Sequence, residues 1–206
     1  ASAQEYNLRR ATLFLKFFAT VIPVVAEVLA VSHFLLEAID ILCHSVDLAH
    51  DNGIGIVITH LSSKENCPPV TDAGLLNFDR LVNYAAKKNI KIAVENQRKL
   101  GNIATILEQY GKDTNVGFCW DVGHEKCFAR GREYMPLFGD RCIATHIHDN
   151  NMIYNCDEHL LPFFGTIDWV DAMGALGEIN FDHCFNYECR MARLPAAVRT
   201  DIGRHA

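Results

Sequence analysis

The run Val116-Gly117-Phe118-Cys119-Trp120-Asp121 is a short apolar segment of strand character that ends on a carboxylate. Four other short apolar runs also end on a side chain that can bind a metal ion. They are Gly55-Ile56-Val57-Ile58-Thr59-His60, Ile90-Lys91-Ile92-Ala93-Val94-Glu95, Ile143-Ala144-Thr145-His146 and Cys184-Phe185-Asn186-Tyr187-Glu188. The active site of a parallel α/β barrel lies at the carboxyl ends of its strands, so these five endings predict a metal-dependent enzyme on such a barrel.

The segments between these runs have the composition of helices. Residues 42–50 are expected to form the end of a helix. Further helices are expected at residues 72–88, 102–110, 133–138 and 167–176, and the last strand is expected at residues 182–188. Asp72 can cap the second of these helices, and Asp168 stands near the start of the last. Strands that alternate with helices predict a parallel sheet, and therefore an α/β protein with a TIM-type (β/α) barrel.

The amino-terminal part of the chain does not share this alternation. From Ala11 to Cys43 the sequence is almost continuously apolar, but Glu27 divides it into uncharged stretches of about ten residues, too short to span a membrane. We therefore expect no membrane segment, and a barrel that is incomplete or irregular at its amino-terminal end. The predicted domain is a single barrel over residues 1–206, with an irregular apolar segment at 1–44 and a recognisable barrel portion at 45–190.

Composition and charge narrow the choice of function. With 206 residues and 50% hydrophobic content, the chain can bury one substantial core. A net charge of -6 gives no overall field that favours polyphosphate, so nucleic acid is not the expected partner. The 8 cysteines are scattered, with none at C-x-x-C spacing, which indicates free thiols in a reducing cytoplasm rather than disulfides.

The side chains at the strand ends form a mixed set of oxygen and nitrogen donors. The set consists of Glu95, Asp121, His146 and Glu188. Such a set suits Mn, Mg, Zn or Fe better than it suits a thiolate site. Any one of these acids could simply cap a helix or pair with a lysine. Acids that converge on one barrel mouth would repel one another without a cation, so the set as a whole predicts a metal site.

Two local motifs add further candidates. His124 stands three residues after the aspartate that ends its strand, and it can turn back toward the same mouth. His146 and His148 alternate along an extended segment and so project to the same side. One of these two is expected to bind metal and the other substrate. Asp157 and His159, in the polar loop that follows, could complete a second metal site or close over substrate.

In this order, the motifs resemble the xylose isomerase-like barrel superfamily. The matching segments are Val94-Glu95-Asn96, Trp120-Asp121-Val122-Gly123-His124, His146-Ile147-His148-Asp149-Asn150, Asp157-Glu158-His159-Leu160-Leu161-Pro162, Gly165-Thr166-Ile167-Asp168-Trp169 and the terminal Glu188. The resemblance covers roughly residues 45–190. The superfamily holds sugar and sugar-phosphate isomerases and epimerases together with type IV apurinic endonucleases, and the motifs do not specify a substrate.

For the isomerases and epimerases, the resemblance implies one divalent metal ion, which could be Mn, Mg or Zn. Its implied ligands are Glu95, Asp121, His146 and Glu188. It also implies that Glu95 and Glu188 exchange protons with carbon next to a carbonyl, through a metal-stabilised enediolate. His124 would hydrogen-bond a substrate oxygen, and His148 is the second expected substrate-binding residue. The expected partner is a small-molecule sugar or sugar phosphate.

Two other functions stay open. For the apurinic endonucleases, the resemblance implies a multi-zinc phosphodiesterase with three zinc ions. The matching positions for its additional ligands are His60, His124, Asp157 and His159. The further histidine that those enzymes have near an early strand has no clear counterpart, because neither His33 nor His44 follows a strand-like run. The other alternative is a non-catalytic barrel that keeps these ligands as a structural metal site.

Two departures from the superfamily pattern carry expectations of their own. Pro162-Phe163-Phe164-Gly165 stands where many relatives read Pro-Gly-x-Gly, so the loop should lose part of the backbone freedom that glycine gives. Full-length relatives are also longer than this chain. An incomplete barrel would expose sheet edges, so we expect a partner chain, such as a second copy in a homo-oligomer, to cover them.

Overall fold

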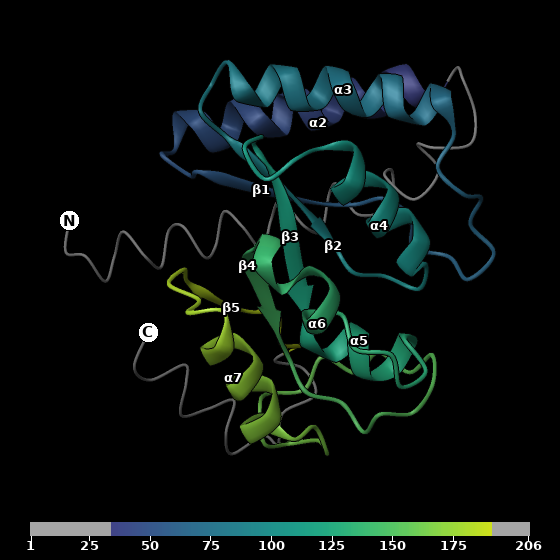
Figure 1. Ribbon diagram of the computed structural model, residues 1–206, viewed down its shortest axis with the longest axis vertical. Helices are drawn as coiled ribbons and strands as arrows, with labels where there is room; N and C mark the ends of the chain where they lie inside the picture. Colours follow the sequence, from purple (N-terminus) through teal and green to yellow (C-terminus); the bar gives the residue numbers. More distant parts are fainter. Residues whose placement is uncertain (1–33, 191–206) are drawn as a thin grey trace. The chain divides into compact units, whose positions relative to one another are not determined.

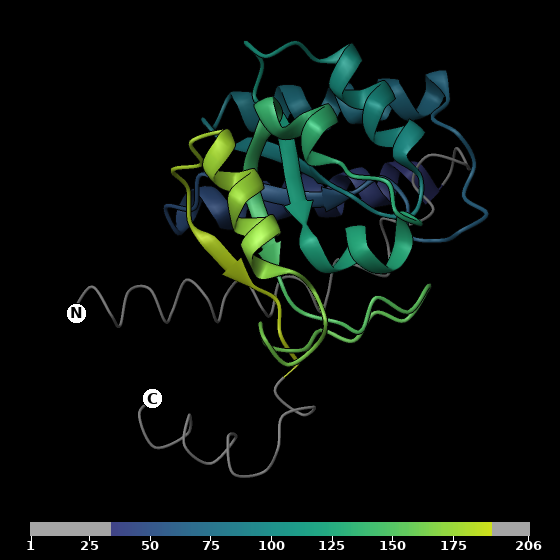
Figure 2. The same cartoon turned by 60° about the horizontal axis from the view of Figure 1, so that its bottom comes forward.

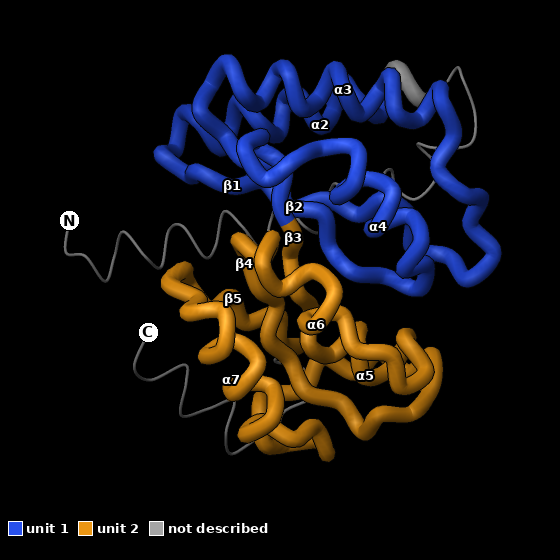
Figure 3. The backbone as a smooth tube through the Cα atoms, in the orientation of Figure 1, with its two compact units in different colours: residues 1–117 blue, residues 118–206 orange. Residues whose placement is uncertain are grey.

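The computed structural model describes residues 34–190 of the chain, and Figure 1 shows their helices and strands. The chain divides into two compact units, the first ending at Gly117 and the second beginning at Phe118 (Figure 3). The boundary falls inside one strand, β3 (Val116–Asp121). Each unit is a set of parallel strands and helices of its own. The prediction of one domain over residues 1–206 stays a prediction.

The first unit alternates helices and strands along the chain. Its elements are α2 (Phe34–Asp51), β1 (Ile56–His60), α3 (Asp72–Ala86), β2 (Lys91–Glu95) and α4 (Leu100–Gln109). Strands β1 and β2 pair in parallel, and His60 lies opposite Glu95 in the register. Both strands are buried at almost every position. The two predicted strand-end side chains of this unit therefore come together at one edge of the pair.

Helices α2 and α3 pack side by side in the first unit (Figure 1). The predicted cap of α3 was wrong by one residue. The capping side chain is Thr71, whose hydroxyl accepts a hydrogen bond from the Gly74 amide at 3.2 Å. Asp72 is instead the first residue of the helix, where its negative charge faces the positive end of the helix dipole.

The second unit begins in β3 and continues through the strands that carry most of the predicted site. Its elements are α5 (Val122–Phe128), α6 (Met135–Phe138), the 3-10 turn η1 (Gly139–Arg141), β4 (Cys142–Ile147), α7 (Trp169–Glu178) and β5 (Phe185–Tyr187). Strand β4 pairs in parallel with β3 and with β5, and Asp121 lies opposite His146. Helix α7 lies alongside β4 and β5 (Figure 2).

Alternation along β3 decides which of its side chains face the helices. Phe118 packs on Tyr134 and Phe138, with ring centroids 6.3 and 5.6 Å away. Trp120, on the same face, donates its indole N–H to the buried Glu125 carboxylate at 2.8 Å. Successive side chains of a strand point to opposite faces, so Asp121 points to the face away from this cluster.

The observed elements confirm the predicted α/β class, and the bounds of several elements differ from the predicted ones. Residues 122–128 form a helix that the sequence did not predict. The last strand is shorter than expected, spanning Phe185–Tyr187 rather than residues 182–188. Among the described residues, no helix is both long and apolar enough to cross a membrane. The predictions for residues 1–33 lie outside the described part of the chain.

Candidate metal centre

Three of the predicted ligands meet at the strand ends of the second unit. Asp121 ends β3, His146 is the fifth residue of β4, and Glu188 follows β5. The His146 Nδ1 atom lies 3.2 Å from Glu188 Oε2 and 3.7 Å from Asp121 Oδ2. The side chains of Asp121 and His146 are buried, whereas Glu188 keeps 22% of its side-chain surface exposed. Three residues that the strand-end pattern predicted as ligands therefore lie close together in this unit.

His148 joins this group from two residues beyond His146. Its Nε2 atom lies 3.0 Å from Asp121 Oδ1, and its side chain is fully buried. Ligand atoms of Asp121, His148 and Glu188 all lie within 4.8 Å of one another. The structure thus puts His148 among the residues that could hold a metal ion, as well as in the region predicted for substrate.

The ring of His148 lies directly over Gly123. A Cβ atom at position 123 would come within 1.9 Å of the His148 Cε1 atom and 2.3 Å of its Nδ1 atom. Such distances are far inside van der Waals contact. Glycine at this position in α5 is therefore what leaves room for the imidazole.

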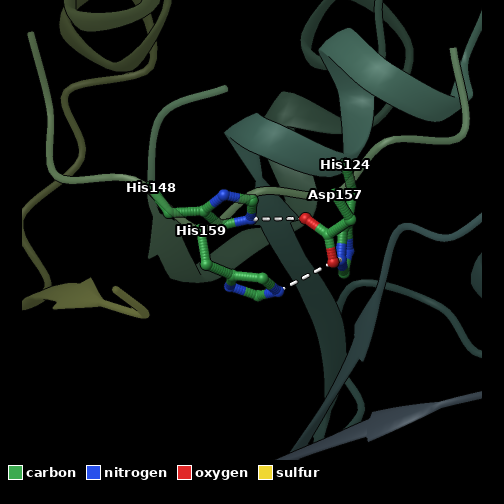
Figure 4. Close-up of side chains that lie close together, drawn as sticks. All are labelled: His124, His148, Asp157 and His159. Carbon is green, nitrogen blue, oxygen red and sulfur yellow. Dashed lines mark ion pairs between the residues drawn. The ribbon is translucent and has the colours of Figure 1, made fainter. Parts of the chain in front are cut away.

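A second group of side chains gathers around Asp157 (Figure 4). Asp157 Oδ2 lies 2.7 Å from His159 Nε2 and 3.4 Å from His124 Nε2, and its Oδ1 lies 3.8 Å from His148 Nε2. The rings of His148 and His159 stack with their centroids 4.1 Å apart. One ligand atom from each of these four residues lies within 4.8 Å of the others. Asp157 and His159 are thus part of a cluster in which the three histidines are buried and the aspartate is partly exposed.

The polar loop that contains Asp157 and His159 folds back toward the end of β4. Its residue Leu160 forms an antiparallel bridge with Asp149, through N–H to O distances of 2.7 and 2.8 Å. His159 adopts a φ of 52°, a conformation unusual for a residue with a Cβ. Its Nδ1 donates to the Glu188 carbonyl at 2.7 Å. That bond holds the ring so that Nε2 faces Asp157.

Charge balance keeps the two central carboxylates ionised. Burial by itself would raise the pKa of Asp121, but the imidazoles of His124 and His148 outweigh it and hold the pKa well below its ordinary value. The pKa of Asp157 is likewise lowered, because His124 and His159 outweigh the effect of burial. Burial lowers the pKa of His159, and Asp157 more than restores it, so that the net shift is upward. Ionised carboxylates are the form that binds a cation.

The donor set fits a divalent metal ion. The Nδ1 atom of His148 and the Oδ1 atom of Asp157 are buried, and neither makes a hydrogen bond within residues 34–190. Buried polar atoms nearly always have a hydrogen-bond partner, so these two stand out. Carboxylate oxygens with imidazole nitrogens are the ligands expected for Mn, Zn or Fe, and this is the set at hand.

Within the first unit, a group of buried side chains surrounds Glu95. The Oε2 atom of Glu95 lies 3.0 Å from His60 Nε2, and its Oε1 atom accepts a hydrogen bond from Gln97 at 3.1 Å. The Gln97 amide also lies 3.1 Å from His60 Nε2. His60 and Glu95 were both predicted, but Gln97 was missed. Its position two residues after Glu95, on the same face of an extended chain, was the available signal.

A family comparison identifies the fold to which these clusters belong. The family model described as the xylose isomerase-like TIM barrel matches residues 32–204. The chain belongs to this family. The predicted resemblance and the predicted TIM-type fold are therefore confirmed.

A curated protein is similar to the chain in sequence. The chain is 32% identical to the uncharacterised protein y4fM of Sinorhizobium fredii over 171 residues, which cover 76% of this chain and 54% of y4fM. It therefore spans about half the length of that curated relative.

Two solved structures also resemble the chain. A D-tagatose 3-epimerase-like protein has a TM-score of 0.66 at 21% identity, covering 88% of this chain and 72% of its own. A D-allulose 3-epimerase from Methylomonas sp. in complex with D-allulose has a TM-score of 0.62 at 17% identity, covering 78% and 58%. At these identities, the likeness concerns the fold.

Proposed function

We propose that this chain belongs to a divalent-metal-dependent isomerase or epimerase that acts on a sugar or sugar phosphate. The observation that carries the proposal is the convergence of Asp121, His146 and Glu188 at the strand ends of the second unit. The two solved structures named above support it, since both carry the name of a ketose 3-epimerase or a protein like one. The reaction proposed is proton transfer at a carbon next to a carbonyl.

The proposed metal ligands are those that the family motifs imply. They are Glu95, Asp121, His146 and Glu188. A divalent ion bound there would supply a Lewis acid that polarises the carbonyl and the neighbouring hydroxyl. Glu95 is included among the proposed ligands because of the motif Val94-Glu95-Asn96 and because it is buried at the end of β2.

Glu188 is also proposed as one of the two groups that exchange a proton with substrate carbon. Its side chain is 22% exposed, whereas Asp121 is fully buried, so Glu188 is the more accessible carboxylate of the pair. Glu95 is proposed as the second proton-exchanging group. His124 and His148 are proposed to bind substrate oxygens, because an imidazole N–H can donate to a hydroxyl or carbonyl oxygen.

The experiment that tests this proposal is solvent-deuterium exchange. A panel of ketoses and ketose phosphates would be incubated in D₂O with the protein and added Mn²⁺ or Mg²⁺. We expect deuterium to appear at the carbon next to the carbonyl of at least one sugar, as measured by NMR. A metal-loaded protein that exchanges deuterium into no member of the panel would contradict an epimerase.

The number of bound ions separates the proposed epimerase from a nuclease. The cluster of His124, Asp157 and His159 is the observation that keeps the multi-zinc alternative in view. Against it, His44 lies exposed on α2 and does not follow a strand, so it supplies no early strand-end histidine. We expect elemental analysis of gently purified protein to give one divalent ion per chain. Three zinc ions would favour the phosphodiesterase, and one ion without exchange would favour the non-catalytic barrel.

The Glu95→Gln variant should weaken both metal binding and deuterium exchange. The change removes a negative charge from the proposed ligand and from the 3.0 Å pair with His60. Mutating a residue that only hydrogen-bonds to a metal ligand typically lowers metal affinity by about 10–100-fold. Mutating a ligand itself should therefore lower the Mn²⁺ affinity by at least about tenfold. Calorimetric titration with Mn²⁺ measures it, with Glu108→Gln on the exposed face of α4 as the matched control. Equal affinities of the two variants would remove Glu95 from the ligand set.

The setting of the enzyme is part of the proposal. All 8 cysteines lie within the described residues, and none of them forms a disulfide there. Free thiols are typical of a reducing compartment, which supports the proposal of a cytoplasmic protein. A homo-oligomer remains proposed on the expectation that sheet edges of the barrel need cover.

A further inference from the structure

The carboxylate of Asp149 accepts four hydrogen bonds from the connection between β4 and α7. Its Oδ1 atom accepts from the amides of Asn150 at 2.8 Å and Ile167 at 3.2 Å. Its Oδ2 atom accepts from the Phe163 amide and the Trp169 indole, both at 2.9 Å. The residue is fully buried. One side chain thus ties the start, the middle and the end of this long loop together.

The backbone of Asp149 also holds the part of the loop that contains Asp157 and His159. Asp149 and Leu160 exchange both of their backbone hydrogen bonds, which places His159 next to the end of β4. On its other side, the His159 carbonyl accepts from the Arg190 amide at 2.8 Å. The segment with Asp157 and His159 is therefore held between two neighbouring stretches of chain.

The loop holds Phe163 in a conformation that favours glycine. Phe163 has a φ of 73°, in the left-handed region that residues with a Cβ rarely adopt. Many relatives are expected to have glycine here, and the loop keeps the glycine-like backbone with phenylalanine in its place. A disfavoured backbone conformation persists only where the surroundings fix it. The hydrogen bond from the Phe163 amide to Asp149 is one such constraint.

Gly165 lets the loop come this close to Asp149. A Cβ atom at position 165 would lie 2.3 Å from Asp149 Oδ1 and 2.4 Å from the Asn150 carbonyl oxygen. The neighbouring Thr166 amide donates to that same carbonyl at 2.9 Å. Position 165 therefore offers a second way to disturb the Asp149 carboxylate without changing it.

We propose that Asp149 is a positioning residue for the site. Its carboxylate holds the connection from β4 to α7 in the conformation that places Asp157 and His159 beside His148. Asp149 touches neither substrate nor metal in this role and acts through the residues that it orders. The inference rests on the proposed function, because it assigns Asp149 to the assembly of the same metal and substrate site.

The test compares Asp149→Asn with Asp168→Asn. An amide keeps one acceptor oxygen and turns its NH₂ group toward two of the four donors, so half of the bonds are lost. Asp168 is the matched control, because it is exposed and caps α7 by accepting from the amides of Val170 and Asp171. Asp168→Asn makes the same chemical change at the end of the same connection, and because asparagine also caps helices well, it should leave the loop that carries Asp157 in place. Binding of Co²⁺ is measured by visible absorption, which reports the ligand geometry directly.

We expect Asp149→Asn to weaken Co²⁺ binding by about tenfold and to change the absorption spectrum. Asp168→Asn should keep the affinity and spectrum of the parent protein. Gly165→Ala should reproduce the Asp149→Asn effect, and the double variant should bind no more weakly than the worse single variant, since both act on one carboxylate. Should Asp149→Asn not fold, Gly165→Ala carries the test. Parent-like Co²⁺ affinity and spectrum in Asp149→Asn would overturn the proposal.

Hydrogen exchange separates this proposal from the proposed function. If the parent protein bound no Co²⁺ at all, the metal-dependent function would fail, but the ordering of the loop could still be measured. The amides of residues 150–168 should exchange faster in Asp149→Asn than in the parent protein or in Asp168→Asn. Equal exchange in all three proteins would show that Asp149 does not hold the loop.

Discussion

The Glu188→Gln variant is expected to keep the fold and to lose solvent-deuterium exchange into a ketose by about 10²–10⁴-fold. That range is the usual contribution of one positioned general acid or base. Glutamine has nearly the shape of glutamate but cannot take up a proton at its side chain. The Glu188 carboxylate lies 3.2 Å from His146 Nδ1 and is partly open to solvent, so the amide should fit without displacing its neighbours.

The measurement separates loss of chemistry from loss of metal. Exchange would be followed by NMR at saturating Mn²⁺, and the metal affinity would be determined for each variant by calorimetry. Glu178→Gln, at the exposed end of α7, is the matched control and should exchange deuterium at the parent rate. If Glu188→Gln also exchanged deuterium at the parent rate when loaded with metal, Glu188 would not be the acid or base.

The parallel register explains why the sequence could predict part of the site. Asp121 and His146 each lie at or near the end of a strand, and parallel pairing puts them opposite one another. A rule that uses only the end of each apolar run therefore finds both residues. Glu188 follows from the same rule, because β5 pairs in parallel with β4.

The cluster around Asp157 could not be predicted in the same way. Its assembly depends on the return of a loop, which the bridge between Asp149 and Leu160 fixes. The local sequence does not indicate this pairing, because the contacts that stabilise the loop join residues far apart in the chain. For example, the Asp149 carboxylate accepts a hydrogen bond from the amide of Ile167, 18 residues away. The sequence placed Asp157 and His159 in a loop near the site, and long-range hydrogen bonds decide that they meet His148.

Helix ends were the least predictable part of the fold. Helix α5 went unnoticed because Asp121 serves both as the end of β3 and as the N-cap of the helix, with its Oδ1 accepting from the His124 amide at 2.7 Å. From the sequence, a helix cap was considered for any of the strand-end acids, but no helix was expected directly after Asp121. For α3, a threonine and an aspartate stand side by side, and both residue types cap helices well.

The loop at Phe163 keeps a backbone conformation that favours glycine. The expected loss of backbone freedom in this loop stays a prediction, and the structure adds that Phe163 adopts a φ of 73°. The left-handed conformation is therefore retained rather than avoided. Its hydrogen bond to the buried Asp149 provides a physical reason, because tertiary contacts can outweigh a local preference.

The Gly123→Ala variant should destabilise the second unit and disrupt the site at the same time. Its methyl group would meet the His148 ring at 1.9 Å, and His148 is fully buried, so the ring must move. Overpacking of this kind costs about 1–3 kcal/mol of unfolding free energy. Movement of the ring would also break the 3.0 Å approach of His148 to Asp121 and its stacking on His159.

The matched control for Gly123→Ala is another helical glycine of the same unit. Gly174 lies exposed inside α7, and a Cβ atom there would meet nothing within 4 Å. Gly174→Ala should therefore stabilise the protein by about 0.5–1 kcal/mol, the usual preference of a helix interior for alanine. Urea unfolding measures the stability of both variants, and Co²⁺ absorption measures the site. A Gly123→Ala protein as stable as Gly174→Ala, with an unchanged Co²⁺ spectrum, would mean that His148 does not occupy the space above position 123. If Gly123→Ala lowers the unfolding free energy while Gly174→Ala raises it, the difference must come from contact with the His148 ring, because both substitutions change helix propensity in the same way.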